Sequence, residues 1–231
     1  GGGDHLYATD FDHAPQVGDF DRMNGGAGFD WASFFFDGVS GPLDLTVTST
    51  TSPTTISVGG QGYAAFVNIE FVDIVFRTGV SHVVIASNLA VGVNLAGGPG
   101  NDYVRAGASA SYLSGMDGDD YLFGSSASED LIDGGAGADR LNGGAGLRDM
   151  VSYYDSPSGV AINIANNTAS GGHATGDVIG GFESISGSFY ADMLIGNSDD
   201  NWLAGNGGAD RIFGGAGNDI LDGVAGSTLT G

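Results

Sequence analysis

Aliphatic residues recur at every ninth position near the end of the chain. From Gly187 the sequence divides into the nonapeptides GSFYADMLI, GNSDDNWLA, GNGGADRIF and GGAGNDILD, whose eighth residues are Leu194, Leu203, Ile212 and Leu221. The three residues centred on each aliphatic predict a short strand whose middle side chain points inward. The six residues before them, rich in glycine and polar residues, predict a turn. This period predicts short strands stacked into a solenoid.

A second array with the same period lies in the middle of the chain. It reads GGPGNDYVR from Gly97, AGASASYLS from Ala106, GMDGDDYLF from Gly115, GSSASEDLID from Gly124, GGAGADRLN from Gly134 and GGAGLRDMV from Gly143. Two of these repeats carry one extra residue. A third, weaker array near the start reads QVGDFDRMN and GGAGFDWAS. The sequence therefore alternates repeat arrays with longer, less regular segments.

The shared motif GGxGxDxUx, where U is aliphatic, resembles the nonapeptide of the repeats-in-toxin (RTX), or hemolysin-type, calcium-binding family. The resemblance covers roughly residues 97–149 and 187–226 closely and residues 16–30 loosely. It implies that two nonapeptides form one turn of a right-handed parallel β-roll, an all-β solenoid, with calcium ions between successive loops along each edge. It also implies a segment of a larger secreted bacterial protein that is exported through a type I channel.

Acidic residues at the sixth position of the repeats are the candidate calcium ligands. Loops on one edge come from alternate nonapeptides, so Asp102 and Asp120, eighteen residues apart, are expected to face each other. Sites made only of oxygen atoms in variable geometry suit Ca²⁺ better than Mg²⁺ or Zn²⁺. Ser111 replaces an acid, so its pairing with Asp130 predicts a weak site. The candidate ligands are Asp21, Asp30, Asp102, Asp120, Asp130, Asp139, Asp149, Asp192, Asn201, Asp210 and Asp219.

The charge balance supports bound cations. The 231 residues include 28 acidic and 6 basic side chains, for a net charge of −22, with 44 glycines and no cysteine. Such a surface repels nucleic acid and anionic lipid, so neither nucleic-acid binding nor membrane insertion is expected. Adaptation to salt or solubility alone is the alternative explanation. The periodic placement of the acids favours several calcium ions.

The longer segments resemble each other and predict an internal duplication, with one unit near residues 16–105 and one near 134–226. We expect a first solenoid unit with widened coils and degenerate repeats at 1–105, a central calcium-binding array at 106–150, and a second widened unit with a terminal array at 151–231. Loops at 48–57 and 166–177 are expected to project outward. Aligning the two units sets His82 opposite Asp192, which predicts a lost site in the first unit.

Glutamates and aromatic residues of these segments leave alternatives open. Glu70 and Glu183 occupy matching positions. Each is either an additional metal ligand or an acid that faces a groove or, as we favour, a solvated or hydrogen-bonded strand residue. The aromatic runs either line a sugar-binding face or, as we favour, pack the widened core or cap an end of the solenoid. These runs are Phe34, Phe35, Phe36, Tyr153 and Tyr154.

No catalytic motif accompanies the repeats. The sequence lacks HExxH, G-x-S-x-G and any cysteine nucleophile, so we predict no catalytic residue and no enzyme activity. The predicted function is a calcium-dependent structural module of a secreted or cell-surface bacterial protein, of the S-layer, filament or adhesin type. The alternative is an ancillary module of a secreted hydrolase, epimerase or toxin. Self-association and cell-surface polysaccharide are the expected partners besides calcium, and both chain ends lie within repeats, as expected for a segment of a longer polypeptide.

Overall fold

The computed structural model describes the backbone of eight strands between residues 5 and 85, and residues 92–126 and 129–231 throughout. The ten-stranded sheet contains, in spatial order, β1 (His5–Ala8), β3 (Trp31–Phe36), β7 (Phe71–Phe76), β9 (Gly92–Pro99), β11 (Ser111–Asp117), β13 (Leu131–Asp133), β15 (Met150–Ser152), β19 (Ser184–Ser186), β21 (Trp202–Ala204) and β23 (Ile220–Asp222). The fourteen-stranded sheet contains β2 (Asp21–Asn24), β6 (Gln61–Val67), β5 (Thr54–Val58), β4 (Leu43–Thr48), β8 (Ser81–Ile85), β10 (Tyr103–Arg105), β12 (Tyr121–Phe123), β14 (Arg140–Asn142), β18 (Val178–Gly180), β17 (Thr168–Ser170), β16 (Ala161–Asn163), β20 (Met193–Ile195), β22 (Arg211–Phe213) and β24 (Thr228–Thr230).

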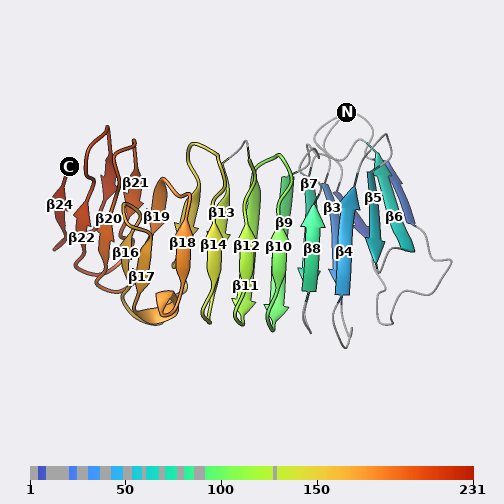
Figure 1. Ribbon diagram of the computed structural model, residues 1–231, viewed down its shortest axis with the longest axis horizontal. Helices are drawn as coiled ribbons and strands as arrows, with labels where there is room; N and C mark the ends of the chain where they lie inside the picture. Colours follow the sequence, from blue (N-terminus) through green and yellow to red (C-terminus); the bar gives the residue numbers. More distant parts are fainter. Residues whose placement is uncertain are drawn as a thin grey trace.

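Successive strands of the repeat arrays alternate between the two sheets, so the chain winds as an elongated parallel β-solenoid (Figure 1). Each strand pairs in parallel with the strand two places later in the array. Tyr103 of β10 lies opposite Tyr121 of β12, which lies opposite Arg140 of β14. The all-β solenoid predicted from the nine-residue period is confirmed.

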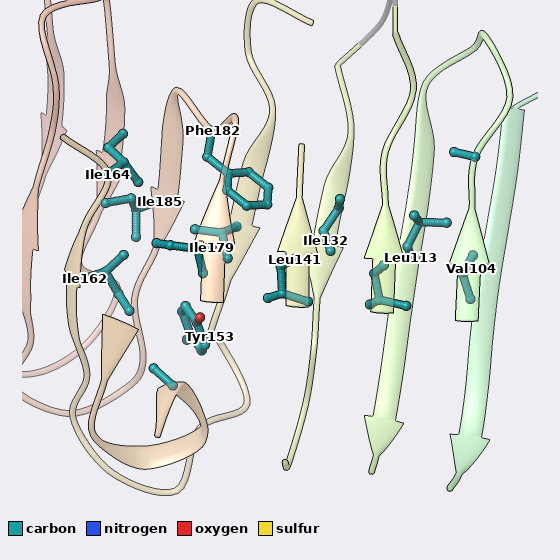
Figure 2. Packing of buried hydrophobic residues seen from close by; sticks show 14 of the residues in the cluster. Val104, Leu113, Ile132, Leu141, Tyr153, Ile162, Ile164, Ile179, Phe182 and Ile185 are labelled. Atoms are coloured by element: carbon teal, nitrogen blue, oxygen red, sulfur yellow. The ribbon is translucent and has the colours of Figure 1, made fainter. Parts of the chain in front are cut away.

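The interior between the sheets is a column of aliphatic side chains (Figure 2). The residues at the eighth position are 0–3 % exposed from β10 to β22. They are Val104, Leu113, Leu122, Ile132, Leu141, Val151, Ile162, Ile179, Ile185, Leu194, Leu203 and Ile212. Burying one such side chain stabilises the fold by about 1.5–3 kcal/mol. Strands of three residues have no stability alone, so each coil depends on its neighbours in this column.

Two wide coils interrupt the regular winding, and they share one topology. In the first wide coil, β4, β5 and β6 form an antiparallel meander between β2 and β8. In the second, β16, β17 and β18 form the same meander between β14 and β20. A 3₁₀ helix, η1 (Gly172–Ala174), joins β17 to β18. Both excursions begin after a strand of the ten-stranded sheet and return to it, at β7 and β19.

Two expectations about these segments were wrong. Residues 54–57 and 168–170 of the expected loops at 48–57 and 166–177 are strand rather than loop, because β5 and β17 extend the fourteen-stranded sheet, whereas residues 49–53 lie outside the described residues. His82 does not match Asp192, since His82 lies in register with Tyr103, at the seventh position rather than the sixth. The register of β8 with β10 places Val83 opposite Val104, whose side chain is buried in the core. Ser81 therefore occupies the register position of Asp102.

No helix in the described part of the chain is long and apolar enough to cross a membrane.

Candidate functional site

The loops that lead from the ten-stranded to the fourteen-stranded sheet form the first edge of the solenoid, and a ladder of carboxylates runs along it. The backbone N–H of Asp102 donates to Oδ1 of Asp120 (2.7 Å), and the N–H of Asp120 donates to Oδ1 of Asp139 (2.9 Å). The N–H of Asp192 donates to Oδ1 of Asp210 in the same way (3.0 Å). Each side chain thus links its own loop to the backbone of the preceding coil.

The loops that lead back form the second edge, which carries a matching ladder. The N–H of Ser111 donates to Oδ1 of Asp130 (2.7 Å), and the N–H of Asp130 donates to Oδ1 of Asp149 (2.9 Å). Farther along, the N–H of Asn201 donates to Oδ1 of Asp219 (3.0 Å). The structure therefore brings together the predicted pairs at spacings of eighteen and nineteen residues.

The second carboxylate oxygen of these residues points back into its own turn. A Cβ atom on Gly115 would collide with Oδ2 of Asp120, and one on Gly134 would collide with Oδ2 of Asp139. The first residue of the repeat is therefore glycine because the carboxylate occupies the space of a side chain. Among the described residues, Oδ2 of Asp120, Asp139 and Asp149 is buried and has no hydrogen-bond partner.

Burial makes the ionised form of these groups unfavourable. It raises the pKa of Asp120 to about 7, against the lowering effect of the Asp102 N–H, and the charges of Asp139 and Asp102 add to the rise. Burial likewise raises the pKa of Asp139 to about 6 and that of Asp149 to about 7. An ionised carboxylate in such a place needs a counter-charge beside it, so the ladder calls for either protons or cations.

The donor set fits a hard cation that binds oxygen. In the described residues no three His, Asp or Glu side chains gather into a chelating cluster, so a cation here must take further ligands from the backbone. The backbone of each loop lies close to carbonyl groups of the next, since a Cβ on Gly137 would collide with the carbonyl oxygen of Gly118. Gly118 has φ +139° and Gly137 has φ +157°, which brings these loops into close stacking. Carboxylate plus carbonyl oxygen is the ligand set of Ca²⁺.

The ladder positions are not equivalent. Ser111 supplies an N–H but no carboxylate, and its hydroxyl donates to the carbonyl of Ser109 (3.1 Å). Oδ1 of Asp192 accepts from the Ser188 hydroxyl (2.8 Å) and from the N–H of Val160 (2.7 Å). Here hydroxyl and amide donors satisfy the carboxylate that a cation would otherwise neutralise.

At the end of the first edge the repeat that lacks an aspartate places Ser227 in the ladder. Its Oγ accepts from the N–H of Asp210 (3.0 Å) and lies 3.2 Å from Oδ2 of Asp210, to which it donates. A serine hydroxyl therefore takes the place of the next carboxylate.

Asp177 is a ladder residue that sequence reasoning missed. It lies directly before β18, and its Oδ1 accepts from the N–H of Asp139 (2.9 Å). Its Oδ2 accepts from the hydroxyl of Tyr153 (2.8 Å), whose ring is buried in the core (Figure 2). Burial raises the pKa of Tyr153 far above its usual value, and the charge of Asp177 adds to this. The first edge thus continues past Asp139 to a carboxylate that a tyrosine caps.

Glu183 continues the second edge. Its Oε2 accepts from the N–H of Asp149 (3.1 Å), so the expectation of a hydrogen-bonded glutamate is confirmed. Asp177 and Glu183 could not be found from a nine-residue period, because a one-residue insertion before Asp149 and the meander β16–β18 shift their positions in the sequence.

Tyr154, the neighbour of Tyr153 in the aromatic run, is 45 % exposed. Its ring contacts that of Phe189 edge-on, with ring centroids 4.5 Å apart.

An outer ladder at the fifth position is a further feature that sequence reasoning missed. The N–H of Asp119 donates to Oδ1 of Asn101 (3.0 Å), and the N–H of Ala138 donates to Oδ1 of Asp119 (2.9 Å). On the second edge the N–H of Asn218 donates to Oδ1 of Asp200 (2.7 Å). These side chains are exposed, so their hydrogen bonds link the solvent-facing parts of successive loops rather than the buried parts.

The first array of the sequence is only partly described. Asp21 begins β2, of which the structure describes the backbone, and Asp30 and Glu70 lie outside the described residues. Strand β2 pairs with β6 so that Asp21 lies opposite Ala64. In the second wide coil the equivalent pairing of β14 with β18 places Asp177 beside Asp139. The first wide coil therefore has an alanine at the position of Asp177.

Comparison with known protein families identifies the type of repeat in the central and terminal arrays. A model of the RTX calcium-binding nonapeptide repeat (4 copies) matches residues 96–128, 125–146, 180–205, 186–221 and 195–228. These segments contain the ladder residues other than Asp149 and Asp177, and repeats of this type bind several Ca²⁺ ions per stretch. The matched residues do not include the looser repeats at 16–30. No curated protein matches the chain.

The raised pKa values predict an acid-stabilised metal-free state. The pKa of an aspartate in the unfolded chain is about 4, whereas burial raises the pKa of Asp120 in the fold to about 7. Protons on the folded ladder therefore stabilise it fully below about pH 4, and this stabilisation is lost as the pH rises to about 7. Circular dichroism of the calcium-free chain should show more β structure at pH 5 than at pH 8. A spectrum that does not change between these values would contradict this assignment.

Tyr153→Phe should destabilise the second wide coil. The change removes the donor that satisfies Oδ2 of Asp177 and leaves a buried carboxylate oxygen short of a partner, at a cost of about 1–3 kcal/mol. Tyr154→Phe is the matched control, because its ring is about half exposed. Urea unfolding in saturating calcium measures both. Equal free energies of unfolding for the two variants would show that the Tyr153 hydroxyl does not support Asp177.

Proposed function

The chain contains arrays of RTX calcium-binding nonapeptide repeats, and from that premise we infer that it is a calcium-folded structural module of the S-layer, filament or adhesin type. The arrays make it a calcium-binding structural module of a secreted bacterial protein, and proteins with such repeats are typically exported by type I systems. The observation that carries the proposal is the pair of ladders of buried carboxylates, one along each edge.

The proposed ligands are the ladder residues at the sixth position. Along the first edge the ions lie between the coils of Asp102, Asp120 and Asp139. Asp192 and Asp210 form a weaker site, because hydroxyl groups of Ser188 and Ser227 already donate to their carboxylates. Oδ2 of Asp120 and of Asp139 is buried without a donor, as expected of an oxygen that takes a cation. Carbonyl oxygens of the stacked loops complete each shell.

Along the second edge, Asp130 pairs with Asp149 and Asn201 pairs with Asp219 as ligands. Asn201 keeps an oxygen but brings no charge, and Ser111 brings no carboxylate, so these positions bind more weakly. Asp21 and Asp30 are the corresponding ligands of the first array.

Folding and calcium binding are then one event. Without calcium, the ladders bury ionised carboxylates at neutral pH, and neighbouring carboxylates repel each other. Calcium removes that cost only when two loops stack, so the binding free energy is largely folding free energy. The chain stays unfolded where calcium is scarce and folds outside the cell, where calcium is abundant.

The shared topology of the two wide coils supports an internal duplication. The meander β4–β6 and the meander β16–β18 occupy equivalent places, and DRMN in β2 corresponds to DRLN at Asp139 and β14. The proposed division is therefore a first unit at 1–105, a central array at 106–150 and a second unit at 151–231. A module with two such broad coils offers more lateral surface than a simple folding tail, which favours the structural role over an ancillary module of a hydrolase, epimerase or toxin.

Calcium titration tests the proposal. Circular dichroism of the chain at neutral pH should change from a coil spectrum in chelator to a β spectrum in calcium, whereas magnesium at the same concentration should not produce the change. A β spectrum that persists after exhaustive removal of calcium would contradict coupled folding.

The same titration on Asp120→Asn separates ligand loss from charge loss. Asp120 serves two neighbouring sites, so the calcium midpoint should rise roughly tenfold, about 1.4 kcal/mol, and the cooperativity should fall. Asp155→Asn removes the same charge from an exposed turn and should leave the midpoint unchanged. Equal shifts for the two variants would show that general charge, rather than the ladder, sets the response.

A further inference from the structure

Part of one face of this acidic molecule is built from strands that carry no acid. The strands of the fourteen-stranded sheet from β10 to β24 contain no Asp or Glu, although the chain has a net charge of −22. The ten-stranded sheet differs, since Asp117, Asp133 and Asp222 lie in its strands. The outer surface of β10 to β24 in the fourteen-stranded sheet, called the acid-free face below, is therefore electrostatically distinct from the ten-stranded sheet.

Exposed arginines lie on this acid-free face. Arg105 ends β10, Arg140 begins β14 and Arg211 begins β22, and all three are exposed. Arg140 lies over the ring of Tyr121, 4.9 Å from its centroid, and also contacts the Tyr121 hydroxyl. An anionic group approaching the molecule meets positive charge here and negative charge at the loops.

Aromatic rings lie beside these arginines. The ring of Tyr103 lies 6.4 Å from that of Tyr121 and 5.8 Å from that of Phe123. Tyr121 is 38 % exposed, and Tyr103 and Phe123 are half-buried. Rings held in this way on a rigid sheet present flat apolar surface to a ligand at little entropic cost.

A groove of about 420 Å³ opens at the ends of these strands, within the size range of small-molecule sites. Tyr103, Arg105, Phe123 and Asn142 line it, together with residues 106–107, 124–126 and 144–145 of the adjoining loops, and none of its lining residues is acidic. Oδ1 of Asn142 accepts from the N–H of Gly144 (2.9 Å), which leaves the amide N–H₂ group as a donor for a ligand.

We propose that this groove binds a uronate-type residue of an acidic polysaccharide, with the sugar ring packed against Tyr103 and Phe123 and its carboxylate paired with Arg105. A guanidinium binds a carboxylate through two parallel hydrogen bonds, and the rings accept the apolar C–H face of a sugar. Arg105, the only charged residue among those that line the groove, favours an anionic ligand over a neutral one. The proposal names a partner for the cell-surface module proposed above and rests on it, because the groove exists only in the folded solenoid.

Calorimetric titration of the calcium-loaded chain with short oligogalacturonates tests the site. The folded protein should bind them and should bind the neutral galactose oligomers of the same length at least roughly tenfold more weakly. Arg105→Gln should weaken binding of the acidic oligomer by a similar factor. Arg148→Gln removes the same charge from the loop before β15, away from the groove, and should bind as the parent chain does.

Four outcomes overturn the proposal: no binding by the folded chain, equal binding of neutral and acidic oligomers, equal losses in Arg105→Gln and Arg148→Gln, or a nucleic acid that competes equally for the site. Circular dichroism in calcium is recorded for each protein, so a failure of calcium-driven folding is seen separately from a failure to bind. If Arg105→Gln does not fold, Asn142→Ala takes its place under the same criteria.

Discussion

The solenoid depends on one repeated interaction, in which a carboxylate of one coil accepts the backbone N–H of the coil before it. Oδ1 of Asp120, Asp139 and Asp149 makes this bond, and Oδ2 of Asp120 and Asp139 is buried in the space left by a glycine. The arrangement fastens successive loops but concentrates negative charge inside the protein. Because three-residue strands cannot hold the coils together by themselves, the means of neutralising that charge decides whether the fold exists.

The chain satisfies the buried carboxylates of its ladders in two ways. In the regular arrays, buried oxygens without donors make calcium the fitting partner. At the second wide coil and near the end of the chain, hydroxyl groups of Tyr153, Ser188 and Ser227 take over. This division confines calcium dependence to the arrays and leaves the wide coil to be held by its core and by local hydrogen bonds. The surface available for a partner, including the groove at Arg105, then rests on a frame that calcium completes.

The sequence was most informative where contacts repeat by simple translation. A period of nine predicts the inward Leu122 and the pairing of Asp102 with Asp120, because each coil sits on the next in constant register. It fails where the register passes through an antiparallel excursion. Asp177 joins the ladder only because β16–β18 returns it beside Asp139, and Ser81 rather than His82 matches Asp102 because β8 pairs with β10 so that Val83 lies opposite Val104. The groove beside Tyr103 was also hidden, since it joins outward side chains of three coils.

Hydrogen exchange of the ladder amides, measured by mass spectrometry with and without calcium at neutral pH, tests the central claim most directly. The N–H groups of Asp102, Asp120 and Asp130 donate to the carboxylates themselves, so their protection reports the ladder rather than the overall shape. The account predicts strong protection across 97–149 and 187–222 in calcium and its loss in chelator. Protection that survives in chelator would show that the ladders form without a cation.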